Sequence, residues 1–343
     1  MISNLLLRWY DKNRRALPWR LQKPDPYKTW ISEMMLQQTQ VETVLPYFAR
    51  FMREFPTVAD LAKAPEAEVL KNWSGLGYYA RARNLHKAAK IVAKKGTFPS
   101  AMVEWLELPG IGAYSAGAIA SIALGEKVPV VDGNVIRVLT RLFALQGDPK
   151  SKPLKEKLWR LAGELVPANR PGDFNQALME LGALVCTPKD PKCGVCPWQK
   201  ECKARLAGNV ALYPTPKEKT PSQKVLIMAS LIQKNGAYLL ARRGEKKHLQ
   251  SMWEFPQMLP EALQIKAKRE KSLPIVHHAI MNRRIQLTPH LYKYVSGKPK
   301  PNGCYVDYCW ISLRELRNYP TSSMNHKIIK DISSKENRRP KAL

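Results

Sequence analysis

The sequence predicts an all-helical first domain followed by a small second domain of mixed α and β structure. Its 343 residues are enough for two domains with separate hydrophobic cores. Up to about Gly208, apolar residues recur at the three- and four-residue spacing of amphipathic helices. Beyond residue 223, short runs rich in β-branched and aromatic residues alternate with turns, as strands do. A proline- and lysine-rich segment separates the two patterns.

The composition indicates a polyanionic partner. The chain carries 56 Lys and Arg against 28 Asp and Glu, a formal charge of +28. Nucleic acid is the simplest partner for such a charge, and a basic surface without a specific partner is the alternative. The sequence has no apolar run of about 18 residues, so we expect no membrane span. We also expect a monomer in the cytoplasm of a bacterial-type cell, associated with the nucleoid.

The helical domain is expected to cover residues 1–208. Its first stretch, "MISNLLLRWYDKN", is typical of an amphipathic helix and lacks the cleavage site of a signal peptide. Helical spacing continues in "YKTWISEMMLQQTQVETVLPYFARFM" and in "YYARARNLHKAAKIVAKK". A linker is expected over 209–223, where "LYPTPKEKTPSQK" has little that could pack. The second domain is expected over 224–325, with strands in "KVLIMASLIQ", "GAYLLARR", "RIQLTPHLYKYVSG" and "GCYVDYCWIS". The basic tail over 326–343 is expected to be disordered.

Four cysteines form the most specific local motif. Cys186, Cys193, Cys196 and Cys202 follow the spacing C-x6-C-x2-C-x5-C, within the loop 186–202. In a reducing compartment, four thiolates so close together indicate a metal ion or a cluster. A zinc ribbon usually has two CxxC pairs, and this loop has one, so the spacing favours one 4Fe-4S cluster over zinc. Cys304 and Cys309 lie in a strand-like run and are expected to be buried small apolar residues.

A short glycine-containing turn is expected between two helices over about 101–124. In "LELPGIGAYSAGAIASIA", Gly110 and Gly112 give the backbone freedom for a tight turn, and the next helix presents unpaired N–H groups. A helix-hairpin-helix of this kind grips a DNA backbone without reading the bases. Taken alone, the motif fits a plain helix–helix turn equally well.

These motifs together carry a family resemblance. The hairpin, the segment with Asp132 and the cysteine loop resemble the DNA glycosylases of the endonuclease III (helix-hairpin-helix-GPD) superfamily. Within it, "SEMMLQQTQVETV", "GLGYYARARNLH" and "VDGNVIRVLTRL" are similar to the MutY-type adenine DNA glycosylases. Beyond the linker, "MWEFPQM" and the strands resemble their Nudix-like recognition domain. The resemblance implies excision of adenine mispaired with 8-oxoguanine or guanine in double-stranded DNA.

Two carboxylates are the candidates for the chemistry of glycosidic bond cleavage. Glu33 lies among apolar residues of a predicted helix, where burial would raise its pKa and suit a general acid. Asp132 stands at a predicted helix start, where a helix N-cap is the structural alternative. The resemblance assigns protonation of adenine N7 to Glu33 and stabilisation of the cationic sugar, or covalent attachment to it, to Asp132. It makes Asn134 and Tyr114 their supporting residues.

The identity of residue 114 separates two kinds of glycosylase. In the lyase branch of the superfamily a lysine stands here, and its amine forms a Schiff base with the sugar. A tyrosine cannot form an imine, so the sequence predicts a monofunctional glycosylase. The alternatives are a bifunctional glycosylase/AP lyase of the endonuclease III type and a non-catalytic iron-sulfur DNA-binding protein.

Further DNA contacts are implied by the resemblance. Gln38 matches the residue that enters the duplex when adenine is turned out. Tyr78 and Tyr79 could stack beside the orphaned base, although core packing is a fair alternative for one of them. In the second domain, Glu254, Glu261 and Glu270 lack the spacing of a Nudix pyrophosphatase, so we expect no such activity. The family's His-x-Phe-Ser-His loop reads His-Ala-Ile-Met-Asn from His278, which keeps only the first histidine.

Overall fold

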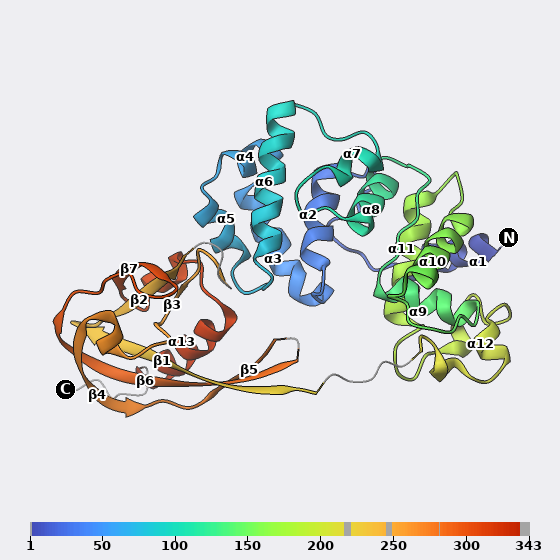
Figure 1. The fold of residues 1–343 in the computed structure, drawn as a ribbon. Coiled ribbons are helices and arrows are strands. Elements are labelled where there is room, and N and C mark those ends of the chain that lie inside the picture. The colour runs from blue at the N-terminus through green and yellow to red at the C-terminus, as the bar shows by residue number, and fades with distance from the viewer. Residues whose placement is uncertain (1, 216–220, 245–248, 281, 337–343) are drawn as a thin grey trace, which may run out of the picture. The chain divides into compact units, whose positions relative to one another are not determined.

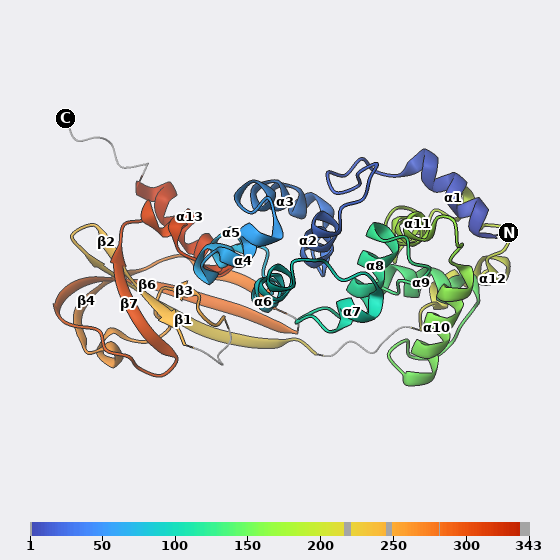
Figure 2. The ribbon, with the colours of Figure 1, turned by 90° about the horizontal axis from the view of Figure 1, so that it is seen from above.

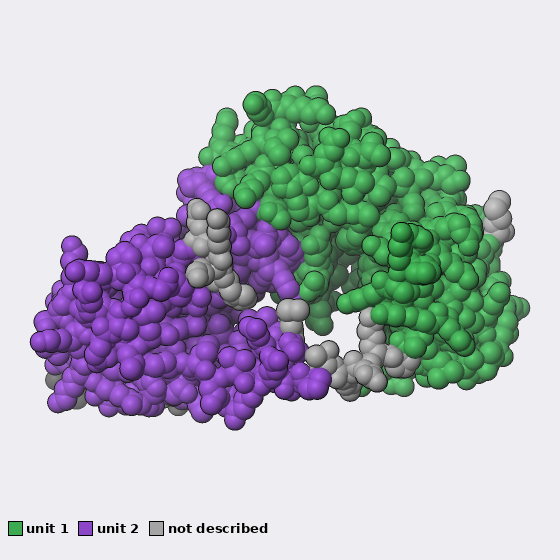
Figure 3. All heavy atoms as spheres, in the orientation of Figure 1, with its two compact units in different colours: residues 1–63, 84–218 green, residues 64–83, 219–343 purple. Residues whose placement is uncertain are grey.

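A computed structural model describes residues 2–215, 221–244, 249–280 and 282–336 of the chain. The chain divides into two compact units, coloured separately in Figure 3. Unit 1 comprises residues 1–63 and 84–218, and unit 2 comprises residues 64–83 and 219–343. The division after residue 218 lies inside the segment expected to be a linker. The segment 64–83, which the sequence assigned to the helical domain, clusters with the second unit.

Unit 1 is helical, as the spacing of its apolar residues predicts. Its helices, labelled in Figure 1, are α1 (Ile2–Asn13), α2 (Pro26–Leu36), α3 (Val41–Glu54), α4 (Val58–Lys63), α7 (Met102–Leu106), α8 (Ala113–Ala123), α9 (Gly133–Leu142), α10 (Lys152–Leu165), α11 (Pro171–Leu184) and α12 (Lys203–Leu206), with short 3-10 turns at Cys193–Val195 and Val210–Leu212. Helix α6 (Ala80–Lys95) crosses the boundary between the units and α5 (Glu66–Trp73) lies in unit 2. The apolar faces of α1, α9, α10 and α11 build one core of this unit.

The helical pattern over residues 27–52 is interrupted in the structure. Helix α2 ends at Leu36 and α3 begins at Val41. Between them Gln38 adopts a left-handed backbone conformation, with φ of 57°. This conformation ends a helix, because a side chain with a Cβ atom rarely continues through it. The sequence spacing alone did not locate this turn.

Unit 2 is built on a mixed β-sheet. Within the described residues it contains β1 (Gln223–Lys234), β2 (Ala237–Arg243), β3 (Trp253–Glu254), β4 (Ile265–Ser272), β5 (Val276–Ile280), β6 (Arg283–Gly297) and β7 (Tyr305–Ile311). The main strand order is β3-β2-β1-β6-β4, with β5 on β6 and β7 on β2. Strands β1 and β6 are parallel and run side by side in Figures 1 and 2, while the other pairs are antiparallel. Strands β3, β4 and β5 were not among the expected strand runs. Exposed residues, most of them charged, fill β4 and obscure the alternation typical of a strand.

A helix occupies part of the segment expected to be a disordered tail. Helix α13 (Ser323–Glu336) packs against β5, with Ile328 and Ile332 buried in the core beneath the sheet. This helix was not predicted from the sequence, because its charged residues are typical of a disordered tail and obscure the apolar stripe. Residues 337–343 of that expected tail lie outside the described part of the chain.

Candidate active site

A pocket of about 520 Å³ opens among the helices of unit 1. Glu33 of α2, Tyr114 of α8, and Asp132 and Asn134 at the start of α9 all line it. The structure therefore brings together the four candidate catalytic residues, which are up to 101 positions apart in the sequence (33 to 134). Helix α11 completes the wall with Gln176, Met179 and Glu180.

Glu33 is the buried acid of this pocket. Its residue is only 5% exposed, since it lies on the inner face of α2 among buried neighbours. Burial raises the pKa of Glu33 to about 7, a shift that the nearby Asp132 carboxylate increases and the Tyr114 hydrogen bond and Arg20 oppose. A carboxyl group with such a pKa is protonated in a large fraction of molecules at neutral pH and can donate that proton.

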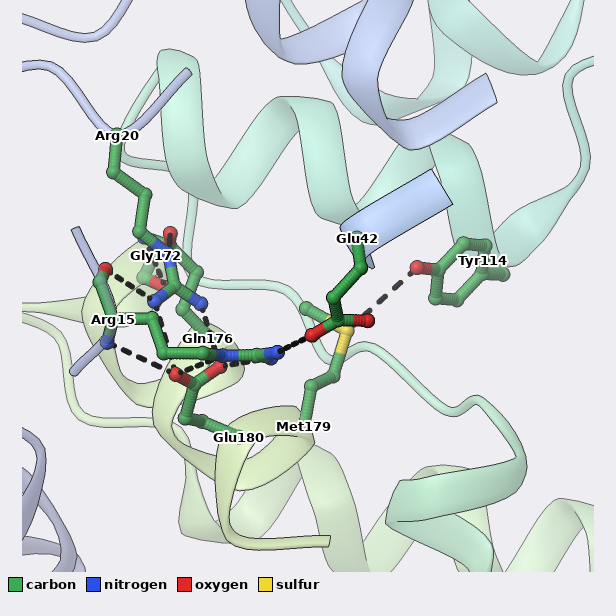
Figure 4. A network of polar contacts seen from close by, with 8 residues as sticks. All are labelled: Arg15, Arg20, Glu42, Tyr114, Gly172, Gln176, Met179 and Glu180. Atoms are coloured by element: carbon green, nitrogen blue, oxygen red, sulfur yellow. Dashed lines mark hydrogen bonds and ion pairs between the residues drawn. The ribbon is translucent and has the colours of Figure 1, made fainter. Parts of the chain in front are cut away.

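Tyr114 holds one side of the Glu33 carboxylate. Its hydroxyl donates a hydrogen bond of 2.6 Å to Glu33 Oε2, and the Met179 sulfur lies 3.7 Å from the same hydroxyl. Figure 4 shows the hydroxyl directed toward Met179. Burial and the neighbouring carboxylates raise the pKa of Tyr114 well above its ordinary value. The tyrosine therefore stays protonated and acts as a hydrogen-bond donor that fixes the orientation of Glu33.

Asp132 caps helix α9 and also faces the pocket. One carboxylate oxygen accepts from Val135 N at 2.7 Å, and the other accepts from Asn134 Nδ2 at 2.9 Å. Burial raises the pKa of Asp132, while these hydrogen bonds favour the ionised form. The N-cap and the site interpretations are thus compatible, because the cap fixes the carboxylate at the pocket wall.

Asn134 is held in turn by Arg137, one turn further along α9. Arg137 donates to Asn134 Oδ1 at 2.7 Å, to Gly182 O at 2.8 Å and to Cys186 O at 2.7 Å. Gly182 leaves just enough room, because a Cβ atom there would lie 2.6 Å from Asn134 Cβ. The start of α9 is therefore clamped against α11 and the beginning of the cysteine loop.

A second polar cluster at the pocket has no signature in the sequence. Glu180 accepts bidentate hydrogen bonds from Arg15 (2.9 Å to each oxygen) and from Arg20 (3.2 and 2.9 Å). Burial opposes ionisation of Glu180, but these hydrogen bonds outweigh it and lower its pKa to about 2. Figure 4 shows Arg15 between Glu180 and Glu42, whose carboxylate lies 4.0 Å from Arg15 Nη1. Arg15 and Arg20 precede Glu180 by 160 residues or more, so no local sequence pattern could predict this cluster.

The expected hairpin joins α7 to α8. Gly110 has φ of +78°, and a Cβ atom there would lie 2.5 Å from Asn84 Cβ. Gly112 is the N-cap of α8 with extended backbone, and nothing lies within 4 Å of the place of a Cβ atom. The turn thus presents the amino end of α8 with bare backbone in front of it, which suits a phosphate oxygen.

The three further candidates for DNA contact differ in exposure. Gln38 is exposed on the turn after α2, whereas its neighbour Gln37 donates to Ser115 Oγ at 2.9 Å. Tyr78 is 50% exposed, with φ of 50° and Arg81 over its ring. Tyr79 is buried, and its hydroxyl donates to Thr321 O at 3.0 Å. Tyr79 thus packs in the core, and Tyr78 is the tyrosine that solvent reaches.

The four loop cysteines converge on one small enclosed space. Cys186, Cys193, Cys196 and Cys202 line a cavity of about 30 Å³. Arg141 Nη1 lies 3.3 Å from Cys186 Sγ, and burial, together with the other three thiols, raises the pKa of Cys196 to about 11. Partly buried thiols around one cavity, with a guanidinium beside them, suit a group that supplies positive charge. Among the described residues, no three His, Cys, Asp or Glu side chains are arranged to hold a single metal ion.

The second unit contains the remaining candidates. His278 lies half-buried on β5, and its pKa is lowered by burial and by Lys327. Met281 of the divergent loop lies outside the described residues. The carboxylate of Glu254 is 1% exposed and takes hydrogen bonds from Arg243 (2.9 Å) and Tyr305 (2.6 Å), which gives it a structural role. Cys304 and Cys309 are both partly buried, and burial raises the pKa of Cys309 to about 11.

Family models match both parts of the chain. Residues 31–164 match the HhH-GPD superfamily base excision DNA repair protein, and residues 227–331 match the NUDIX domain. A solved thermostable thymine-DNA glycosylase is 32% identical, with a TM-score of 0.55 over 60% of this chain and 95% of that one. No helix in the described part of the chain has the length and apolar character needed to cross a bilayer.

Curated relatives share one description. The adenine DNA glycosylase of Rattus norvegicus is 35% identical, and the match covers 95% of this chain and 76% of the relative. The adenine DNA glycosylase of Arabidopsis thaliana is 41% identical, over 74% of this chain and 47% of that relative. The chain thus spans about half the length of the plant relative and three quarters of the rat one.

Proposed function

The chain belongs to the adenine DNA glycosylases, base excision repair enzymes of the HhH-GPD superfamily, and we propose that it excises adenine opposite 8-oxoguanine or guanine by hydrolysis. The observation that carries this proposal is the pairing of two carboxyl groups with different environments on one pocket. Burial raises the pKa of Glu33 to about 7. Burial also raises the pKa of Asp132, but the hydrogen bonds that Asp132 accepts from Val135 N and Asn134 Nδ2 favour its charged form and oppose that rise. Such a pair supplies an acid and an anion at the same pH.

Glu33 takes the role of the general acid. A protonated Glu33 gives its proton to N7 of an adenine in the pocket, which turns the base into a better leaving group. Tyr114 holds the carboxyl oriented from one side, through its 2.6 Å hydrogen bond. After proton transfer the same hydrogen bond stabilises the carboxylate that remains, so the group is kept in place through the step.

Asp132 takes the role of the anion that faces the sugar. Breaking the N-glycosidic bond leaves positive charge on the sugar, in an oxocarbenium-like state. The Asp132 carboxylate, fixed by Val135 N and Asn134 Nδ2, stabilises that charge until water completes the hydrolysis. We expect Glu33→Gln and Asp132→Asn to abolish excision and to leave duplex binding intact.

A panel of duplexes tests the activity. Adenine opposite 8-oxoguanine, guanine, cytosine or thymine would be incubated with excess protein, and abasic sites would be measured after alkaline cleavage. The proposal expects excision from the first two duplexes in preference to the others. Equal excision from all four, or none, would contradict it.

We propose a monofunctional enzyme because residue 114 carries a phenol. An imine requires a primary amine at the sugar, and Tyr114 has none to offer. Wild-type protein should leave unbroken abasic strands, and Tyr114→Lys should give a covalent DNA adduct on borohydride treatment. Strand scission and strong trapping by the wild type would favour the lyase alternative instead.

We further propose that the cysteine loop holds one 4Fe-4S cluster. Cys186, Cys193, Cys196 and Cys202 would be its ligands, and the cluster would supply the positive charge that their thiolates require. Bound there, it would cross-link the loop that Arg137 and Arg141 attach to α9. Iron and sulfide in near-equal amounts in purified protein are expected, and stoichiometric zinc without iron would contradict the proposal.

A further inference from the structure

The loop between α5 and α6 holds a tyrosine in an exposed and strained position. Within residues 74–79, Gly75, Gly77 and Tyr78 have φ of 104°, 75° and 50°. Glycine adopts such angles readily, whereas a bulky residue rarely does. Tyr78 is also 50% exposed, although it is aromatic. Backbone strain of this kind persists only where the surrounding structure holds it, and it is concentrated at functional sites.

The segment before α13 anchors the base of this loop. Ser74 Oγ donates to Thr321 O at 2.7 Å, and the Tyr79 hydroxyl donates to the same oxygen at 3.0 Å. Gly75 N donates to the Tyr79 hydroxyl at 3.3 Å. Thr321 is buried, and all of these residues belong to unit 2. Both ends of the loop therefore converge on one buried carbonyl group, which fixes the path of the residues between them.

Arg81, in the first turn of α6, joins the exposed ring to the core. Its Cζ atom lies 5.4 Å from the ring centroid of Tyr78 and 5.3 Å from that of Trp73. Both distances are within the range of a cation–π contact. Trp73 is buried, and its Nε1 donates to Gly77 O at 3.1 Å, while Arg81 Nη2 donates to the same oxygen at 3.4 Å. One guanidinium group thus contacts the buried indole, the loop backbone and the exposed phenol ring.

The burial of Arg81 suits a role inside the protein better than a contact with a phosphate. The residue is 9% exposed. Burial lowers the pKa of Arg81 to about 10, so the guanidinium group stays charged at neutral pH. A cation–π contact becomes stronger when water is excluded from it. A buried and charged arginine against an aromatic ring is therefore placed to fix the orientation of that ring.

We propose that Arg81 is a positioning residue for Tyr78, and that the exposed side of the Tyr78 ring stacks on a base of the bound duplex. Because the ring is held before DNA arrives, little side-chain freedom is lost on binding. Stacking accepts any base, since every base has a π face, so the contribution should be equal opposite 8-oxoguanine and opposite guanine. This inference rests on the proposed function, because it takes a duplex with mispaired adenine as the ligand.

A double-variant cycle tests this role in the full chain. Arg81→Met keeps an unbranched side chain and removes the guanidinium group, and it should weaken binding to a duplex with adenine opposite 8-oxoguanine about 5-fold. In a Tyr78→Phe background, which keeps the ring, the factor should remain about 5-fold. In a Tyr78→Leu background it should fall below about 2-fold, because the two residues act as one unit.

A matched control lies two residues further along α6. Arg83 is a half-buried cation whose Nη1 donates to Gln250 O at 3.0 Å. Arg83→Met removes the same charge from the same helix, and it should weaken duplex binding less than about 2-fold. Arg81→Lys keeps the charge and loses the planar group, so it should also weaken binding, and it replaces Arg81→Met in the cycle if the methionine variant is unstable.

Two further measurements separate positioning from other roles of Arg81. The slope of log affinity against log salt should be the same in Arg81→Met and wild type, because a buried guanidinium group releases no DNA counterion. Single-turnover excision at saturating protein should stay within about 2-fold of the wild-type rate, since Arg81 is not among the residues that line the pocket of Glu33.

Each contrary outcome has a definite meaning. Equal effects of Arg81→Met in the Tyr78→Phe and Tyr78→Leu backgrounds would show a role in folding alone and would overturn the proposal. A salt slope that falls by about 1 would assign Arg81 to a phosphate instead. Unchanged duplex affinity in Tyr78→Leu would overturn stacking. Absence of excision by the wild type, with the expected binding cycle, would refute the proposed function and leave the role of Arg81 standing.

Discussion

At the scale of single residues, the site depends on what surrounds Glu33. An exposed glutamate would be ionised at neutral pH, and burial in the pocket wall raises its pKa to about 7. The negative charge of Asp132 raises the pKa of Glu33, and the hydrogen bond from the Tyr114 hydroxyl lowers it. The three side chains therefore set the pH range over which an acid is available.

The pH dependence of excision follows from this arrangement. If protonated Glu33 is required, kcat/KM for excision should fall as pH rises above about 7. Tyr114→Phe removes a hydrogen bond that stabilises the carboxylate, so the pKa of Glu33 rises and the alkaline limb moves to higher pH, by about one unit. Met179→Leu keeps the hydroxyl and should leave the limb in place. A limb that moves to lower pH in Tyr114→Phe would contradict the assignment.

At the scale of elements, two contacts far apart in the sequence shape the pocket and the hairpin. Glu180 attaches α11 to the segment before α2 through Arg15 and Arg20. Gly110 lets the turn before α8 approach Asn84 of α6. In each case one side chain, or the lack of one, decides how two elements meet.

Glu180→Gln should destabilise the chain strongly. Two guanidinium groups then lose their charged partner in a buried place, which costs about 3 to 5 kcal/mol. Glu164→Gln, in the exposed pair with Arg160, is the control and should cost at most about 1 kcal/mol. Because the pKa of Glu180 is lowered from 4.5 to about 2, its contribution is full above pH 4.5 and is lost as pH falls toward 2. Urea unfolding of both variants across this range would show the difference narrowing only for Glu180→Gln.

The two hairpin glycines should respond differently to alanine. Gly110→Ala places a Cβ atom in a left-handed conformation and against Asn84, at a cost of at least about 1 to 2 kcal/mol. Gly112→Ala meets nothing within 4 Å and has φ of −101°, so its stability should change by less than about 1 kcal/mol. Thermal unfolding measures both, and equal losses would argue against the geometry of the turn.

At the scale of the whole molecule, the dominant feature is the charge of +28. If this charge serves a DNA backbone, duplex affinity should fall at least about 100-fold between about 50 and 200 mM salt, through release of counterions. Fluorescence anisotropy with a labelled duplex would measure the slope. An affinity that hardly changes over this range would contradict binding through phosphates.

The sequence by itself determined the order of the two folds, the family and the residue types of the site. Periodic apolar spacing reports helices and strands directly, and the motifs around Glu33, Tyr114 and Asp132 are continuous in the chain. What these residues do once folded remains a prediction, but the structure places them on one pocket.

Only the tertiary structure decided which groups become neighbours. The clamp on Glu180, the burial of Tyr79 against Thr321, and the parallel pairing of β1 with β6 all join segments distant in the sequence. Helix α13 was likewise not predicted, because its charged residues obscure the apolar side chains that pack into the core of unit 2. The physical reason is that burial and charge pairing depend on three-dimensional proximity, whereas sequence patterns record only the local period of the backbone.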